Sequence, residues 1–207
     1  MRILIVGASG TIGRAIVAAI PRGHELVLVS RKTSPLRVDI QDAESISTLY
    51  RTVGLVDAVV CTAGDVAFAP LAELSNADFA FSLKNMLMGQ INLVRFGLPN
   101  VPDSGSLTLT SGTLWQAPMW GGAAISLVTA GLEGFVRAAA LEAPRGIRVN
   151  AVRPPWVTET LAARGMEQGD GLPAAVIARS YLRSLFGQET GVIIEPRLDE
   201  ALGADSM

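Results

Sequence analysis

Residues 2–17 read RILIVGASGTIGRAIV, and this stretch decides the fold. The apolar run RILIV predicts a buried strand, and residues 11–20 predict a helix that ends at Pro21. Three glycines lie in the turn between the two elements: Gly7, Gly10 and Gly13. A strand, a glycine turn and a helix in this order are typical of the first unit of a parallel α/β sheet.

The same alternation continues along the rest of the chain. It predicts an α/β fold, namely a Rossmann-type, doubly wound parallel sheet of about seven strands with helices on both faces. A short strand is expected near residues 36–38, where the chain leaves no room for a crossover helix. The other strands are expected at 25–30, 56–61, 106–111, 147–152 and 192–195, and the helices at 42–52, 76–97 and 122–143.

Length and composition favour one domain over residues 1–196, followed by a C-terminal tail at 197–207. The 207 residues are 49% hydrophobic and carry 17 basic against 19 acidic side chains, a net charge of −2. This balance argues against nucleic acid as a partner. Cys61 is the only cysteine and His24 the only histidine, so neither an intrachain disulfide nor a Cys/His metal site is expected. The glycine-rich stretch 104–132 is poor material for a membrane span, and a cytoplasmic protein is expected.

The glycine turn predicts a dinucleotide site, because glycines let the backbone approach a pyrophosphate at a helix N-terminus. An ordinary glycine-rich turn is the alternative interpretation. The residues expected to contact the cofactor here are Gly7, Ser9, Gly10, Thr11, Ile12 and Gly13.

The end of the second strand indicates which dinucleotide binds. An acidic residue there would accept from the ribose 2′-hydroxyl, but this chain has Ser30, Arg31 and Lys32. Two cations and a hydroxyl suit a 2′-phosphate, so NADP(H) is favoured over NAD(H). A solvated basic loop is the alternative.

Several later segments resemble the short-chain dehydrogenase/reductase family over nearly the whole chain. CTAG at 61–64 is similar to the family's NNAG turn, and residues 132–142 with 145–160 resemble its post-catalytic helix, sixth strand and nicotinamide-side loop. Thr190-Gly191-Val192 resembles the family's entry to the last strand. The resemblance implies further cofactor contacts at Asp39, Ile40, Thr62, Ala63, Gly64, Pro154, Val157 and Thr158.

The catalytic residues of that family are a different matter. Family enzymes use an Asn–Ser–Tyr–Lys tetrad, in which the lysine lies one helical turn after the tyrosine and lowers its pKa. The tyrosines of this chain (Tyr50, Tyr181) and its lysines (Lys32, Lys84) form no pair with that spacing. Alignment places Ile125 and Thr129 at the Tyr and Lys positions, and Met86 at the Asn position. The remaining catalytic candidates are Ser111, Asn85 beside Met86, and Lys84, for which a solvated surface role is the alternative.

Two functions follow from this combination. The first is an NADP(H)-dependent oxidoreductase with an altered catalytic set, acting on an unidentified substrate beside three tryptophans: Trp115, Trp120 and Trp156. The second is a catalytically silent NADP(H)-binding sensor or scaffold. Pocket specificity is expected to depend on a mobile loop at 161–173.

The helix expected at 122–143 is apolar on almost every side up to Arg137, and a helix of that kind has to be buried. The family resemblance implies an interface between copies through helices 76–97 and 122–143. We therefore expect a homodimer or homotetramer. A mass of one chain in light scattering would contradict this expectation.

Overall fold

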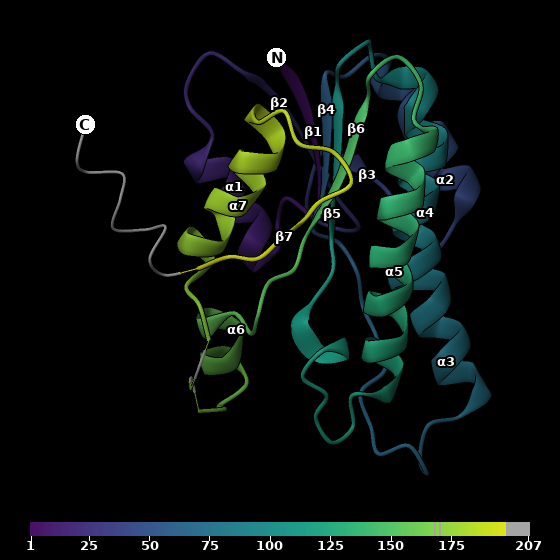
Figure 1. The fold of residues 1–207 in the computed structure, drawn as a ribbon, viewed down its shortest axis with the longest axis vertical. Helices are drawn as coiled ribbons and strands as arrows, with labels where there is room; N and C mark the ends of the chain where they lie inside the picture. The colour runs from purple at the N-terminus through teal and green to yellow at the C-terminus, as the bar shows by residue number, and fades with distance from the viewer. Residues whose placement is uncertain (168, 170, 198–207) are drawn as a thin grey trace.

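A computed structural model describes residues 1–167, 169 and 171–197 of the chain (Figure 1). Seven parallel strands form one sheet in the order β3-β2-β1-β4-β5-β6-β7. The order reverses between β1 and β4, which is where open α/β sheets place a ligand crevice. The strands are β1 (Arg2–Val6), β2 (Glu25–Ser30), β3 (Leu36–Arg37), β4 (Ala58–Cys61), β5 (Ser106–Thr110), β6 (Arg148–Val152) and β7 (Ile193–Ile194).

Helices cover both faces of this sheet (Figure 1). On one face lie α2 (Ala43–Val53), α4 (Gly89–Gly97) and α5 (Ala123–Glu142), which share a core with β1 side chains such as Leu4 and Val6. On the other face lie α1 (Thr11–Ala19) and α7 (Ala174–Phe186), which pack on Ile3 and Ile5. Alternate residues of β1 thus point into opposite cores, as the two-residue repeat of a strand requires. The predicted doubly wound α/β fold is confirmed.

Two helices were absent from the sequence prediction. The segment 161–173, expected to be a mobile loop, begins inside α6 (Thr158–Ala163), so its first three residues are helical, and its mobility stays a prediction. Val157 and Leu172 form a parallel bridge, and the Thr158 N–H donates to the Leu172 carbonyl at 3.0 Å. The second helix is α7, whose Ile177 and Tyr181 are fully buried. The expected tail lies outside the described residues from 198 onward.

The predicted helix 76–97 is continuous but not uniform. It comprises α3 (Asn76–Ser82), a π-helical segment (Leu83–Met88) and α4. Ser75 caps its start in a reciprocal capping box with Asp78. A π-helical turn widens the helix by one residue and rotates the side chains that follow, and here it brings Asn85 inward while Lys84 stays exposed.

Helix α5 is buried on one face only in this single chain. Val128, Leu132 and Val136 pack against the sheet, whereas Leu127 is 49% and Leu141 89% exposed. The second face is uncovered in the single chain, and its burial in an interface between copies stays a prediction. In the described part of the chain, α5 is also the one helix long and apolar enough to span a membrane, judged by length and composition alone.

Candidate functional site

The glycine turn after β1 brings three chain segments into close contact. Gly7 has a φ of +91°, and a Cβ built there would lie 2.7 Å from the Ala63 nitrogen. A Cβ on Gly13 would lie 2.2 Å from the Gly7 carbonyl oxygen. The first intrahelical bond of α1 runs from the Arg14 N–H to the Gly10 carbonyl, so the preceding N–H groups face the turn without helical partners. Side chains at these two positions would collide with the neighbouring backbone, so the close packing of the turn requires glycine.

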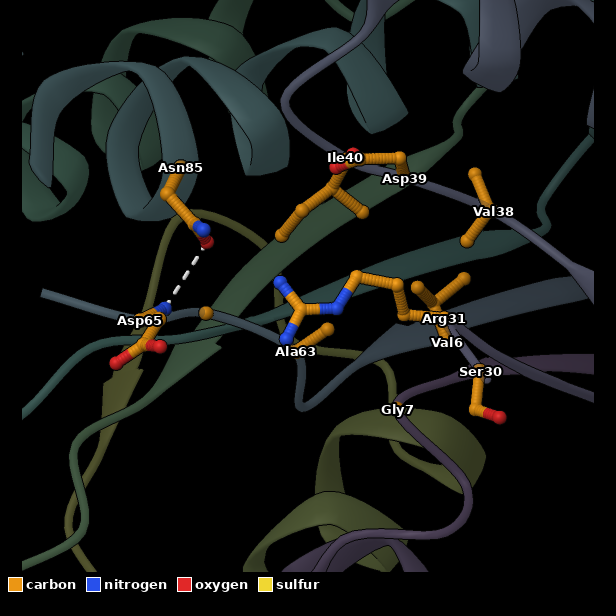
Figure 2. A pocket seen from close by; sticks show the side chains of 11 residues that line it. Val6, Gly7, Ser30, Arg31, Val38, Asp39, Ile40, Ala63, Asp65 and Asn85 are labelled. Carbon is orange, nitrogen blue, oxygen red and sulfur yellow. Dashed lines mark hydrogen bonds between the residues drawn. The ribbon is translucent and has the colours of Figure 1, made fainter. Parts of the chain in front are cut away.

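A cavity of about 190 Å³ lies beside this turn, and we call it the β1–β4 crevice (Figure 2). It opens where the strand order reverses. Among the predicted cofactor residues that line it are Gly7, Ser30, Arg31, Asp39, Ile40, Ala63 and Gly64. Val6, Val38 and Asp65 also line it and were missed from the sequence, although each is a neighbour of a predicted residue.

The basic end of β2 is arranged differently from the sequence expectation. The Arg31 side chain extends into the crevice towards Ala63 (Figure 2), while Lys32 is exposed and is absent from the crevice lining. Ser30 is 5% exposed, and its Oγ accepts from the backbone N–H groups of Thr33 and Ser34 at 3.1 and 2.9 Å. Ser30 therefore holds the loop that presents Arg31.

Asn85 reaches the same crevice from the π-helical segment (Figure 2). It is 4% exposed, and its Oδ1 accepts from the Asp65 N–H at 3.0 Å. The side chain thus ties the helix to the loop after β4. A second hydrogen bond joins the loop after β4 to the glycine turn, because Thr62 Oγ1 donates to the Gly7 carbonyl at 3.2 Å.

A second cavity, of about 170 Å³, lies at the carboxyl ends of β5 and β6, and we call it the β5–β6 pocket. Of the predicted residues, Ser111, Pro154 and Val157 line it. Leu114, Ile125 and Trp156 add apolar walls, so the family's tyrosine position presents a hydrocarbon side chain. Trp120 lies elsewhere and is 82% exposed. Thr158 begins α6 and is not part of either lining.

A buried ion pair lies behind Ser111 and was not predicted. Glu133 on α5 and Arg153 after β6 are 1% and 5% exposed, and two nitrogens of Arg153 donate to the two oxygens of Glu133 at 2.7 and 2.6 Å. Ser111 Oγ donates to Glu133 at 2.7 Å. Burial by itself would raise the pKa of Glu133, but the hydrogen bonds from Arg153 and Ser111 outweigh it and lower that pKa below its usual value.

The two tyrosines lie in the core and are absent from both cavity linings. The Tyr50 hydroxyl donates to the Leu93 carbonyl at 2.7 Å, and the Tyr181 hydroxyl bonds to Thr110 Oγ1 at 2.6 Å. Burial raises the pKa of both phenols, and it raises the pKa of the Cys61 thiol to about 12. None of the three groups is suited to proton transfer near pH 7.

Lys84 and His24 lie away from both cavities. Lys84 is exposed on the outer side of the π-helical segment. His24 is half-buried at the opposite edge of the sheet, with its ring 5.3 Å from that of Phe186. In the described residues, no group of three or more acidic, histidine or cysteine side chains is placed to hold a metal ion.

Comparisons with known proteins agree with this geometry. A family model described as enoyl-(acyl carrier protein) reductase matches residues 12–191. An uncharacterized oxidoreductase of Schizosaccharomyces pombe is 27% identical over 168 residues, which are 73% of this chain but only 65% of the yeast protein. The chain therefore spans less than two thirds of that relative's length.

Two solved structures resemble the whole fold. A protein from Listeria innocua is 37% identical with a TM-score of 0.91, covering 95% of this chain and all (100%) of that one. A small-chain dehydrogenase solved in complex with NADPH has a TM-score of 0.83 over 94% of this chain and 95% of its own. At 23% identity, the second likeness shows the fold alone.

Proposed function

The chain belongs to the short-chain dehydrogenase/reductase family, and on that premise we propose that it is an NADP(H)-preferring oxidoreductase with an altered catalytic set. The family binds nicotinamide dinucleotides, and the β1–β4 crevice has the glycine cradle that such a cofactor needs. The observation that carries the NADP(H) preference is Arg31, whose guanidinium extends into the crevice.

A guanidinium at this position suits a 2′-phosphate better than a 2′-hydroxyl. Arginine binds phosphate through two parallel charge-assisted hydrogen bonds, and the chain has no acidic side chain at the end of β2 to accept from a ribose. Asp39, which follows β3, lies beside Ile40 in the crevice lining (Figure 2). Among the described residues that line the crevice, Arg31 is the one cation, so it is the group proposed to bind the 2′-phosphate.

The test is the affinity of the Arg31→Ala variant for NADPH and for NADH, measured by tryptophan fluorescence. We expect NADPH binding to weaken about 10- to 100-fold, because one charge-assisted pair contributes about 1.5–3 kcal/mol, while NADH binding changes little. Arg37→Ala is the matched control, since Arg37 is exposed on β3 and lies outside the crevice lining. An equal loss of affinity for both cofactors would contradict the NADP(H) preference. Failure of the unchanged protein to bind either cofactor would contradict cofactor binding itself.

The β5–β6 pocket is the proposed reaction site. A bound NADPH would supply hydride, and the residues of this chain would bind and orient the acceptor against apolar walls formed by Ile125, Trp156 and Leu114. The proton would come from water or from the substrate, since neither tyrosine reaches this pocket.

The second candidate function is a catalytically silent NADP(H)-binding sensor or scaffold. It is favoured by Ile125 and Thr129, neither of which can donate a proton usefully at the positions where the family has its tyrosine and lysine. The gain-of-function variant Ile125→Tyr/Thr129→Lys separates the two candidates.

A further inference from the structure

The Glu133–Arg153 pair is a rigid, charged group behind an otherwise apolar pocket wall. Arg153 contacts Glu133 through two parallel bonds and also donates to Gln116 at 2.6 Å and to Glu195. Its guanidinium lies 5.4 Å from the Trp115 ring. Because two carboxylates and an amide oxygen surround one guanidinium, the arginine stays charged and Glu133 stays ionised.

An ionised carboxylate can only accept hydrogen bonds, so it determines which way the Ser111 proton points. Ser111 Oγ lies 2.7 Å from Glu133 Oε1, and its other neighbour, the Thr129 carbonyl oxygen at 3.4 Å, is also an acceptor. A hydroxyl has one proton, and here it is directed away from the pocket towards Glu133. Only the lone pairs of Ser111 remain for a ligand.

We infer that Glu133 and Arg153 are positioning residues that hold Ser111 as an obligatory hydrogen-bond acceptor, so that the β5–β6 pocket selects small apolar alcohols over the corresponding ketones. A ketone oxygen would meet the lone pairs of Ser111 and gain no hydrogen bond there. An alcohol can donate to Ser111 while its hydrocarbon part packs on Ile125 and Trp156. The cavity of about 170 Å³ is large enough for a five-membered ring.

This inference rests on the proposed function and deepens it, because the alcohol is the substrate of the oxidative direction, in which NADP⁺ would take the hydride from the carbinol carbon and water would take the hydroxyl proton. Its test requires no turnover and no bound cofactor. If NADPH binds but the pocket shows no preference for the alcohol, only the inferred selectivity is overturned. If NADPH does not bind, the proposed function is overturned.

The experiment compares the dissociation constants of cyclopentanol and cyclopentanone by NMR titration of the full chain. We expect the unchanged protein to bind the alcohol about tenfold more tightly, which corresponds to one net hydrogen bond. Ser111→Ala should remove this preference. Glu133→Gln should keep it, because the amide oxygen takes the place of Oε1, which also accepts from Arg153 Nε, and Ser111 still donates to that oxygen.

Ser106→Ala is the matched control on the same strand. Ser106 lies at the other end of β5, and its buried Oγ has no hydrogen-bond partner among the described residues, so the preference should be unchanged. Equal binding of both ligands, no binding of either, or a preference that survives Ser111→Ala would each overturn the inference. If Glu133→Gln fails to fold, the Ser111→Ala result still decides.

A second arm repeats the titrations with saturating NADP⁺. A preference that persists supports the alcohol as the group that Ser111 binds. A preference that disappears would mean that the carboxamide N–H of the cofactor occupies Ser111, and it would overturn the assignment to substrate.

Discussion

The β1–β4 crevice and the β5–β6 pocket lie at the same edge of the sheet but differ in chemistry. The crevice carries charged side chains, Arg31, Asp39 and Asp65, around a glycine turn with no room for a Cβ. The pocket is mostly apolar, with Ile125 at the family's tyrosine position and its charged pair hidden behind Ser111. The crevice thus has features that suit the proposed dinucleotide, whereas the apolar lining of the pocket motivates the proposal of an altered catalytic set.

The largest expected effect comes from breaking the crevice. Gly13→Val places a side chain where a Cβ would already lie 2.2 Å from the Gly7 carbonyl oxygen, so the backbone must move. We expect loss of measurable NADPH binding and a free energy of unfolding lower by about 3 kcal/mol. Fluorescence titration and urea denaturation measure the two effects.

Gly134→Val serves as the control for that variant. Gly134 is also helical, on α5, and a Cβ there would meet no atom within 4 Å. A Gly13→Val protein that still bound NADPH normally would show that the glycine cradle is not the cofactor site.

The next effect comes from restoring an acid in the pocket. The double variant Ile125→Tyr/Thr129→Lys recreates the family's spacing on α5, and a positioned general acid contributes about 100-fold or more to rate. We expect NADPH-dependent reduction of small ketones to rise by about that factor in a spectrophotometric assay. Ile125→Tyr alone should gain little activity, because no neighbouring cation then lowers the pKa of the new tyrosine. A double variant that binds NADPH yet reduces nothing would favour the sensor or scaffold.

The smallest effect concerns the charge behind Ser111. The folded-state pKa of Glu133 lies below its ordinary value of 4.5, so its ionisation stabilises the fold above about pH 4.5, and this contribution is lost as the pH falls through the folded-state pKa. Glu133→Gln should cost about 2 kcal/mol at pH 7, and the difference from the unchanged protein should narrow towards pH 3. Chemical denaturation at several pH values measures this.

Glu189→Gln is the comparison for that pH series. Glu189 pairs with Arg183 at 2.9 Å, but both side chains are largely exposed, so its removal should change stability by less than about 1 kcal/mol. An equal pH dependence in both variants would contradict the special role of the buried carboxylate.

Seven of the predicted cofactor residues line the crevice because they follow local rules. Gly7 and Arg31 come directly after a strand and Ala63 two residues after one, and parallel strands bring their carboxyl ends to one edge. Helix α7 was missed although Ile177, Tyr181 and Leu185 recur at helical spacing, because their partners are on α1 and the sheet. The pairing of Val157 with Leu172 could not be predicted from the sequence, since it joins residues on either side of α6.

Sequence by itself determined the strand–glycine–helix beginning, the parallel sheet and the absence of a Tyr–Lys pair at the family's spacing, because these depend on residue type and short-range spacing. Only the tertiary structure decided what Ser111 can do. Its proton is directed by a carboxylate on α5 that an arginine after β6 holds ionised, and these three residues meet only because α5 packs against β6. A hydroxyl can either donate or accept, and its three-dimensional neighbours, not its identity, choose between the two.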